Sequence, residues 1–376
     1  MEQEQFFNNV SKYVHLVSLY LNKKDASDLT IDDNELSFFV KLSKHHSLVS
    51  FLYKVIKDTK VNVSEQSLKR LEEYYYSRLQ KVVLFDKERK SLFQYLNENQ
   101  IDYLPLKGLI IKDFYLDPYT REFADNDILF DPNKDELVKK FFTSRHYEIE
   151  QYKKTNHDVY LKKPVYNFEM HRALFMVNED YPSYVAYFEN CLKNSPVKEG
   201  YEHYLNKEDF YIYFTAHSYK HYQNSGCGIR TLVDYYLYLK NNNLDFSYIN
   251  QELEKLDLVD FSNKFRELAI KIFDETPLTD EEKETLLFIA SSGTYGTLEN
   301  SVSKGVKKKG KFRYFMSRIF PPMSYYKTYH SWAYKSKVLI PVAWFIRFFR
   351  ILFKNPGKAT KELKMITKSK EEKKSN

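Results

Sequence analysis

Residues 101–130 read IDYLPLKGLIIKDFYLDPYTREFADNDILF, and this stretch decides the expected fold. It begins with the apolar run Leu104–Leu106, passes through Lys107-Gly108, and continues into a helix-like segment, Leu109–Tyr115. Two aspartates then precede the apolar run Ile128–Phe130. This order predicts a strand, a glycine turn, a helix and a second strand that carries two carboxylates.

The two aspartates, Asp125 and Asp127, are two residues apart, so on a strand both side chains leave the same face. Carboxylates this close repel each other, and a divalent cation is the usual compensation; an oxygen-only ligand set suits Mg²⁺. Glu169, in the strand-like segment YNFEMHRALF, is the best candidate for a third ligand in a two-metal site. The alternative is that the aspartates only cap a turn, and an isolated D-x-D motif favours that alternative.

Lys107 and Gly108 lie where the first apolar strand meets the expected helix. Backbone N–H groups and the helix dipole form an anion site at such a junction, and the lysine adds charge suited to a triphosphate. The alternative is a tight glycine turn beside a solvated lysine, because a K-G pair alone is not specific.

The segment LKGLIIKDFYLDPYTREFADNDILF resembles the opening motif of the uncharacterised bacterial nucleotidyltransferase family. The matching residues are Leu106, Lys107, Gly108, Tyr115, Asp117, Pro118, Arg121, Asp125 and Asp127. The resemblance continues through Glu169-Met170-His171 and the segment HSYKHYQNSGCGIRTLVD, and it covers about residues 65–353. That family is similar to the DNA polymerase beta-type nucleotidyltransferase superfamily.

The resemblance implies transfer of a nucleoside monophosphate from an NTP, with ATP as the expected donor, to an unidentified acceptor hydroxyl. It implies that Asp125, Asp127 and Glu169 are catalytic and hold Mg²⁺. It assigns Lys107, Gly108 and Arg121 to the nucleotide. The chain departs from the family pattern in four ways: no serine follows Gly108, the spacing from Gly108 to the aspartates is longer than in the compact form of the superfamily, Asn126 replaces an apolar residue, and the third acid is Glu.

His217 and His221 are four residues apart on an expected helix and therefore share one face. We expect them, with His171, Arg230 and Asp234, to bind substrate. A zinc site is the less favoured interpretation, because the H-E-x-x-H glutamate is missing and the sequence shows no obvious third ligand. Histidines packed among aromatic residues at a helix contact are a further alternative for His217.

Composition favours a mostly helical α+β protein, since Tyr and Phe number 33 and 29 while Gly and Pro number only 9 and 11. We expect a small mixed sheet embedded between two helical regions. The expected parts are a helical region at 1–98, the nucleotidyltransferase core at 99–176, a helical region at 177–353 and a basic disordered tail at 354–376. Two cysteines and the lack of a signal-like N-terminus suggest a reducing, cytoplasmic location.

The net charge of +7 is concentrated in the C-terminal third, which suits an anionic partner there. The apolar segment 338–353 is interrupted by Pro341 and provides only ~18 Å of helix, which is too short to span a membrane. The core of the protein, a partner groove and a membrane surface are alternatives for it, with the core preferred. A nucleic-acid partner is compatible with the charge but not favoured. The alternative function is a non-catalytic nucleotide- or polyanion-binding protein on a degenerate nucleotidyltransferase fold.

Overall fold

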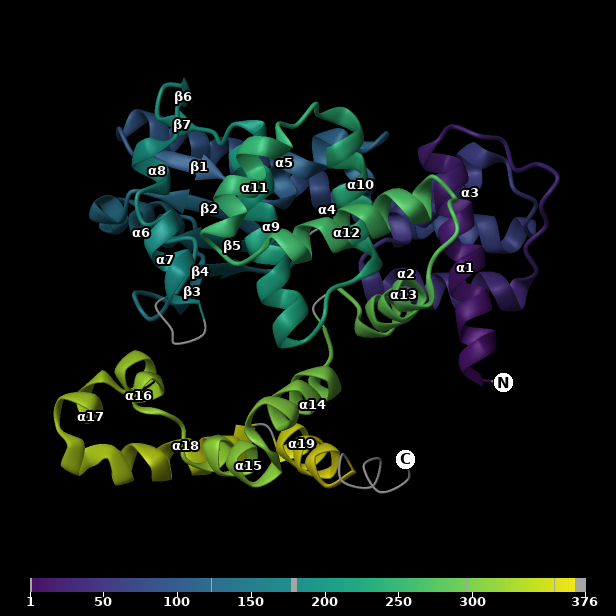
Figure 1. The fold of residues 1–376 in the computed structure, drawn as a ribbon. Coiled ribbons are helices and arrows are strands. Elements are labelled where there is room, and N and C mark those ends of the chain that lie inside the picture. Colours follow the sequence, from purple (N-terminus) through teal and green to yellow (C-terminus); the bar gives the residue numbers. More distant parts are fainter. Residues whose placement is uncertain (1, 123, 177–180, 295, 355, 369–376) are drawn as a thin grey trace. The chain divides into compact units, whose positions relative to one another are not determined.

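A computed structural model describes residues 2–122, 124–176, 181–294, 296–354 and 356–368. The chain divides into two compact units (Figure 1). The first unit comprises Met1–Tyr219 with Gly228–Thr294, and the second comprises Lys220–Cys227 with Tyr295–Asn376. The expected α+β class is confirmed, because helices flank a small mixed sheet that lies wholly in the first unit.

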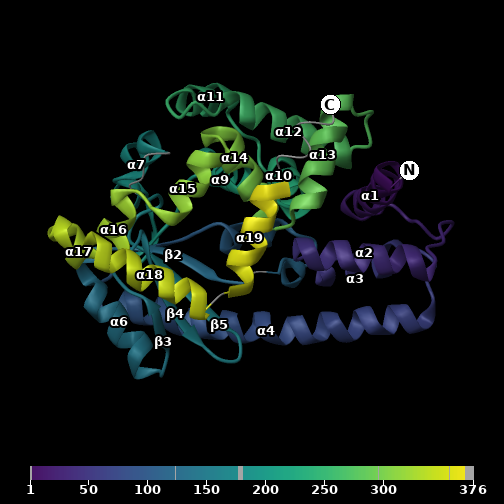
Figure 2. The ribbon, with the colours of Figure 1, turned by 90° about the horizontal axis from the view of Figure 1, so that it is seen from below.

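Four helices form the N-terminal part: α1 (Glu2–Leu21), α2 (Asp33–His46), α3 (Val49–Thr59) and α4 (Glu65–Glu98). Ser64 caps the start of α4, since its side chain accepts a hydrogen bond from the Ser67 N–H. The buried residues of α4 recur every three or four positions in its second half, which is the helical period. Its 34 residues make a rod of about 51 Å. Figure 2 shows α4 passing α3 at one end and the strands β4 and β5 at the other.

Seven strands form one sheet in the order β3-β4-β5-β2-β1-β7-β6. Their bounds are β1 Tyr103–Pro105, β2 Asn126–Phe130, β3 Glu148–Gln151, β4 His157–Lys162, β5 Tyr166–His171, β6 Val197–Glu199 and β7 Glu202–His203. The β2–β5 and β1–β7 pairs are parallel, and the other pairs are antiparallel. The strand expected around Glu169 is present as β5, and β3 and β4 precede it in the chain. The sheet extends past residue 176, since β6 and β7 follow α7 (Pro182–Phe188) and α8 (Cys191–Asn194).

The connection between β1 and β2 differs from the expected helix over 109–115. The helix α5 covers only Gly108–Ile111 and is followed by two 3₁₀ turns, η1 (Lys112–Phe114) and η2 (Pro118–Thr120). Asp117 caps η2 by accepting a hydrogen bond from the Tyr119 N–H, and Pro118 occupies the first position of that turn. The segment therefore reaches β2 through short turns and not through a continuous helix.

One face of the sheet is the hydrophobic core. Ile128 and Phe130 of β2 and Phe168 and Met170 of β5 are each fully buried there. They pack against α4 and against α6 (Asp135–Ser144), which follows the 3₁₀ turn η3 (Pro132–Lys134). The high aromatic content is used in this core, where Phe142 stacks on Tyr160 with 4.1 Å between ring centroids.

The first unit is completed by α9 (Lys207–Asn224, as far as Tyr219), α10 (Ile229–Asn241), α11 (Phe246–Glu254), α12 (Val259–Phe273) and α13 (Asp280–Ser292). The helix α12 packs on both α10 and α1, so the two ends of this unit share one helical layer.

The second unit contains α14 (Leu298–Lys309), α15 (Lys311–Ile319), α16 (Met323–Tyr329), α17 (Ser331–Lys335), the 3₁₀ turn η4 (Lys337–Leu339), α18 (Ile340–Lys354) and α19 (Pro356–Lys368). The expected disorder after residue 354 is wrong for α19. Ile366 is buried against Val302 and Tyr314, and Glu362 pairs with Arg318 at 2.6 Å. Residues 369–376 of the expected tail lie outside the described residues.

The expectation that 338–353 is mainly core is also wrong. Phe345 and Phe349 of α18 are 54% and 51% exposed, and Ala343 is the residue of α18 that enters a buried cluster of this unit. No helix of the described residues combines the length and apolarity needed to cross a membrane.

The stacked aromatic core gives a stability prediction. Replacing Phe142 by Ala removes a fully buried ring and leaves a cavity, so the free energy of unfolding should fall by about 3–5 kcal/mol. Val83→Ala is the control, because Val83 is 50% exposed on α4 and its loss should change stability by under about 0.5 kcal/mol. Urea unfolding followed by circular dichroism measures both, and equal losses for the two variants would contradict the assigned core.

Candidate functional site

The carboxylates expected to form the site gather on the sheet face opposite the core. Asp127 of β2 is the direct cross-strand partner of Glu169 of β5. Neighbouring positions in register point the same way, so both side chains leave this face. Asp125 lies two residues before Asp127 and lines the same small cleft.

A histidine stands between the two paired acids. The His171 Nε2 atom lies 2.7 Å from Asp127 Oδ1 and 3.9 Å from Glu169 Oε2. The Lys107 Nζ atom lies 3.1 Å from the same Asp127 oxygen. A lysine and a histidine thus compensate the charge of Asp127, and one imidazole touches both acids that were expected to bind metal.

The cleft has a volume of about 60 Å³, roughly twice the share of one water in the liquid. Its lining consists of Leu106, Lys107, Gly108, Leu109, Arg121, Asp125, Asp127 and Arg230. It has room for an ion with very few waters.

The turn at Lys107-Gly108 was expected to form an anion site with backbone N–H groups and a helix dipole, but in the structure Gly108 is explained by the close approach of Arg121. Lys107 has a backbone φ of +44°, a strained value for a residue with a side chain. A Cβ on Gly108 would lie 2.3 Å from Nη1 of Arg121, so glycine is required by that guanidinium. Because α5 is a single turn, its dipole provides little of the expected anion site, and the charge there comes from the Lys107 ammonium.

The pKa values of the cleft residues Asp125, Asp127 and Lys107 are shifted by different balances of burial and neighbouring charge. Burial and the neighbouring Asp127 raise the pKa of Asp125 from 3.8 to about 6, although Lys107 and Arg230 oppose the rise. Burial also acts to raise the pKa of Asp127, but Lys107 and His171 outweigh it and hold that pKa below its usual range. Burial acts to lower the pKa of Lys107, but the two aspartates outweigh it, so this ammonium stays charged.

Asp234 anchors the segment that leads into β2. Its carboxylate accepts hydrogen bonds from Arg121 Nε at 2.9 Å and from Arg121 Nη2 at 2.7 Å. The Tyr115 hydroxyl donates to the same carboxylate at 2.7 Å. All three side chains are buried. The Tyr and Arg of the Y-x-D-P-x-x-R motif are therefore held by α10, while the Nη1 of Arg121 faces Gly108.

The remaining expected substrate residues are distributed over both units. Arg230, near the start of α10, lines the cleft and donates to the Glu122 carbonyl at 2.6 Å. His217 lies on α9 with its ring 6.1 Å from that of Tyr213. His221 belongs to the second unit. Among the described residues, the cluster of three possible metal ligands is His157, Glu169 and His171, and neither the H-x-x-x-H pair nor Asp125 and Asp127 belong to it.

Asn126, which departs from the family pattern, has a partner on the core side. Its side-chain oxygen accepts a hydrogen bond from Arg89 of α4 at 3.1 Å, and Arg89 also pairs with Asp86 at 2.5 Å. The signal was present in the sequence, because Arg89 falls on the buried face of α4 between Phe85 and Leu92. A buried arginine needs a polar partner in the core.

Tyr213 and His157 were missed. Tyr213 is fully buried, close enough to Lys107 and Asp127 for both charges to act on its hydroxyl. Nothing in the sequence distinguishes Tyr213 from its neighbours, because α9 contains many aromatic residues. His157 is paired with His171 across β4 and β5, and the strand-like alternation of HDVYLK was a usable signal once β4 was placed beside β5.

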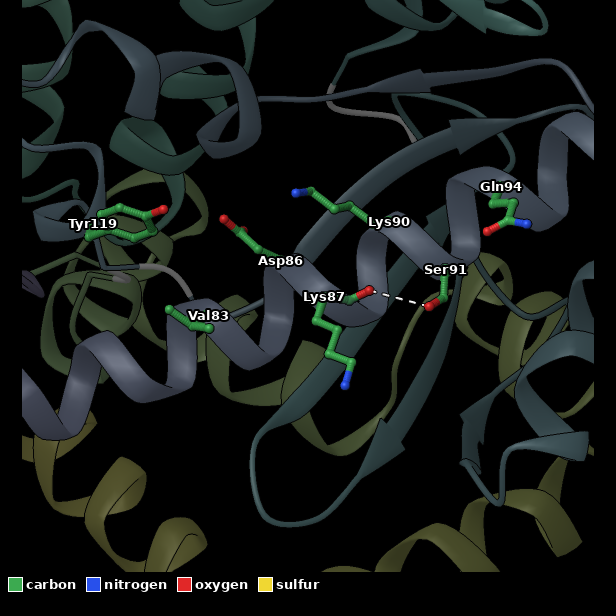
Figure 3. A pocket seen from close by; sticks show the side chains of 7 residues that line it. All are labelled: Val83, Asp86, Lys87, Lys90, Ser91, Gln94 and Tyr119. Atoms are coloured by element: carbon green, nitrogen blue, oxygen red, sulfur yellow. Dashed lines mark hydrogen bonds between the residues drawn. The ribbon is translucent and has the colours of Figure 1, made fainter.

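A second hollow of about 430 Å³ follows the surface of α4 (Figure 3). It is lined by Val83, Asp86, Lys87, Lys90, Ser91, Gln94 and Tyr119. Asp86 pairs with Arg89 and Lys112, whereas Lys87 and Lys90 add positive charge to the hollow. Tyr119 connects it to the segment that carries Arg121, but none of the acids of the cleft lines it.

The buried anchor gives a prediction about stability. Asp234→Ala leaves the Arg121 guanidinium buried without its carboxylate, so we expect a loss of about 3–5 kcal/mol in the free energy of unfolding. Tyr115→Phe removes one hydrogen bond to a charged group and should cost about 1.5–3 kcal/mol. Urea titration at neutral pH measures both variants. A Tyr115→Phe loss larger than that of Asp234→Ala would contradict this account.

The raised pKa of Asp125 predicts how stability depends on pH. The folded protein binds the Asp125 proton more tightly than the unfolded chain does, so this contribution is present below pH 3.8 and is lost as pH rises through about 6. At pH 7, Asp125→Asn should therefore have a free energy of unfolding about 1–3 kcal/mol higher than that of the unsubstituted protein, since a pKa difference of one corresponds to 1.36 kcal/mol. Near pH 4 the two proteins should have similar free energies of unfolding. Urea midpoints at both pH values test this.

The matched control for that test is Asp113→Asn, because Asp113 is exposed on η1. Its substitution should leave the pH dependence unchanged. A stability gain in Asp125→Asn that is the same at pH 4 and pH 7 would show that the carboxylate charge is not its source.

The model of the family described as uncharacterised nucleotidyltransferase matches residues 32–274. The match covers well over half of the chain, so the chain belongs to this family. The site acids, the Lys107-Gly108 turn and Asp234 all fall inside the matched range, whereas the resemblance noted beyond residue 274 falls outside it. The assignment indicates a transferase acting in nucleotidyl transfer in general. Comparisons with curated proteins and with solved structures gave no match.

Proposed function

We propose that this member of the uncharacterised nucleotidyltransferase family transfers a nucleoside monophosphate from an NTP to an acceptor hydroxyl, with Mg²⁺ bound at Asp125, Asp127 and Glu169. The observation that carries the proposal is the register of β2 on β5, which sets Asp127 directly beside Glu169. The adjacent Lys107-Gly108 turn brings a cation to the same cleft as Asp125.

The donor set suits such an ion. Burial and the repulsion from Asp127 together raise the pKa of Asp125 to about 6, and a divalent cation would remove that repulsion. Asp127 Oδ1 and Glu169 Oε2 lie 2.7 Å and 3.9 Å from His171 Nε2, so the two carboxylates border the same imidazole. When bound, Mg²⁺ supplies activation of the attacking hydroxyl and charge neutralisation for the departing pyrophosphate.

The basic groups of the cleft take the phosphates. Lys107 is charged and, on exchanging Asp127 for a phosphate oxygen, would hold the triphosphate at the turn. Arg230 lines the cleft beside Asp125 and is a second contact for phosphate. Arg121 contributes its Nη1 edge, while its bidentate pair with Asp234 fixes its position. This division makes Asp234 a positioning residue and not a direct substrate ligand.

The finer assignments are part of the same proposal. ATP is the proposed donor, and His217, His221 and His171 are proposed to face the acceptor. Membership of the DNA polymerase beta-type superfamily, a bacterial source and action in the cytoplasm also remain predictions.

Activity should depend on the paired acids. Asp127→Asn removes a metal ligand worth several kcal/mol of transition-state stabilisation, so pyrophosphate release should fall by about 10³-fold or more. The measurement is pyrophosphate release from each NTP with Mg²⁺ and pooled metabolites, followed by label transfer from α-labelled NTP to identify the acceptor.

Asp113→Asn is again the control and should keep full activity, since Asp113 is exposed. Two results together would contradict the enzyme hypothesis: nucleotide binding that is unchanged in Asp127→Asn, and no pyrophosphate release from the unsubstituted protein. They would favour the non-catalytic nucleotide-binding protein.

A further inference from the structure

Two histidines and a glutamate come together beside the transfer cleft. One ligand atom from each of His157, Glu169 and His171 lies within 4.8 Å of the others. The three residues come from two adjacent strands, where His157 is paired with His171 and Glu169 lies two positions before His171. They therefore project from the same face of the sheet.

The spacing is close to that of a ligand set. The Glu169 Oε2 atom lies 3.7 Å from His157 Nε2 and 3.9 Å from His171 Nε2. Ligands about 2.1 Å from a tetrahedral ion are about 3.4 Å from one another. The two distances to Glu169 would contract by a few tenths of an ångström on ion binding, and all three ligand atoms lie within 4.8 Å of one another. Among the three, His171 is buried, and the other two side chains are about one quarter exposed, so an ion has a route in.

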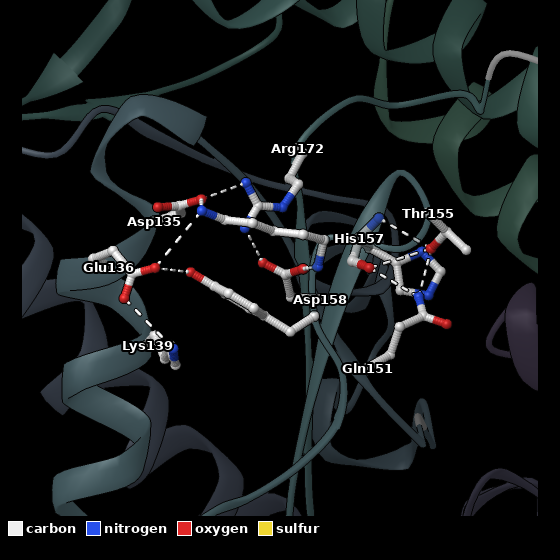
Figure 4. A network of polar contacts seen from close by, with 10 residues as sticks. Asp135, Glu136, Lys139, Gln151, Thr155, His157, Asp158 and Arg172 are labelled. Carbon is white, nitrogen blue, oxygen red and sulfur yellow. Dashed lines mark hydrogen bonds and ion pairs between the residues drawn. The ribbon is translucent and has the colours of Figure 1, made fainter. Parts of the chain in front are cut away.

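A polar network links Asp158 and Arg172, the residues that follow the two histidines in the chain (Figure 4). Arg172, which follows His171, donates to Asp158 at 2.6 Å, and Asp158 follows His157. Arg172 also donates to Asp135 at 2.8 Å. This charged pair ties β4 to β5 at the position where the histidines face each other.

The loop before β4 adds a second restraint. Gln151 donates from its side chain to the His157 carbonyl at 2.9 Å, and the Thr155 hydroxyl donates to the same carbonyl. A site on paired strands with its neighbours fixed in this way is preorganised, which lowers the entropy lost when an ion binds.

We propose that His157, Glu169 and His171 bind one divalent first-row transition metal ion of the zinc or cobalt type. Two imidazole nitrogens and one carboxylate favour these ions over Mg²⁺, which prefers oxygen ligands only. Three protein ligands leave a position open for water or substrate, as in catalytic zinc sites. The site is distinct from the Asp125–Asp127 pair but shares Glu169 with it.

The relation of this ion to nucleotidyl transfer rests on the proposed function. Asp127 contacts the same His171 nitrogen that faces Glu169. An ion on that nitrogen takes the place of the hydrogen bond to Asp127, so the Asp127 carboxylate becomes available to the transfer cleft. Metal binding at the histidines itself does not depend on any transfer activity.

Equilibrium dialysis of the full chain against Zn²⁺ in the presence of excess Mg²⁺ tests the site. The unsubstituted protein should retain one zinc ion per chain. Zinc affinity should fall at least about 10-fold in His157→Gln and in His171→Gln. His15→Gln is the control for surface histidines, since His15 is about half exposed and contacts Glu275, and it should bind zinc normally. Asp125→Asn should also bind zinc normally.

Co²⁺ gives a readout that needs no substitution, because its visible absorption changes when imidazole nitrogen replaces water. Circular dichroism confirms that each variant is folded. Three results would overturn the site: no zinc retention by the unsubstituted protein, zinc retention in His157→Gln and His171→Gln equal to that of the unsubstituted protein, or an equal loss of zinc in Asp125→Asn and His157→Gln. Zinc binding with the expected pattern but without pyrophosphate release would support the metal site and contradict the proposed nucleotidyl transfer.

Discussion

The buried carboxylate of Asp234 is the constraint on which the site depends. It accepts bonds from Tyr115 and Arg121, which lie at the two ends of the segment leading from α5 to β2. More than one hundred residues of sequence separate the two sides of this contact. Because a buried ion pair is destabilising unless its hydrogen bonds are complete, the three bonds fix the segment in one conformation. The entry to β2, and with it Asp125, is thereby positioned against α10.

The charges of the cleft do not favour the stability of the folded protein. Asp125 is held near Asp127 against its own repulsion, and Lys107 adopts a strained backbone conformation beside them. Each of these features raises the free energy of the folded protein by itself. The compensation comes from the aromatic core on the other face of the sheet, where Phe142, Tyr160 and Phe168 are fully buried. Alternate residues of β2 face the hydrophobic core and the strained cleft, so one strand connects the stabilising packing to the destabilising charges.

The sequence predicted the parts of the site that depend on local spacing. The two-residue interval of Asp125 and Asp127, the strand around Glu169 and the helix beginning at Ser64 all follow from short-range periodicity. Sequence reasoning could not find contacts made across the chain. Asp234 was assigned to substrate, because nothing in its own segment shows that Tyr115 and Arg121 reach it. The strands β6 and β7 were missed because they are short and mostly charged, and α19 was missed because its packing in the buried cluster depends on two apolar residues, Met365 and Ile366.

The helix α4 has a consequence for how the first unit loses its structure. At one end Tyr75 packs on Tyr53 of α3, and further along Phe85 packs on Phe168 of the sheet. Since a single helix belongs to both hydrophobic layers, melting either layer removes half of the packing that keeps α4 helical. The N-terminal helices and the sheet are therefore coupled in unfolding. Under heat or denaturant they should unfold in one cooperative transition without a stable partly folded intermediate.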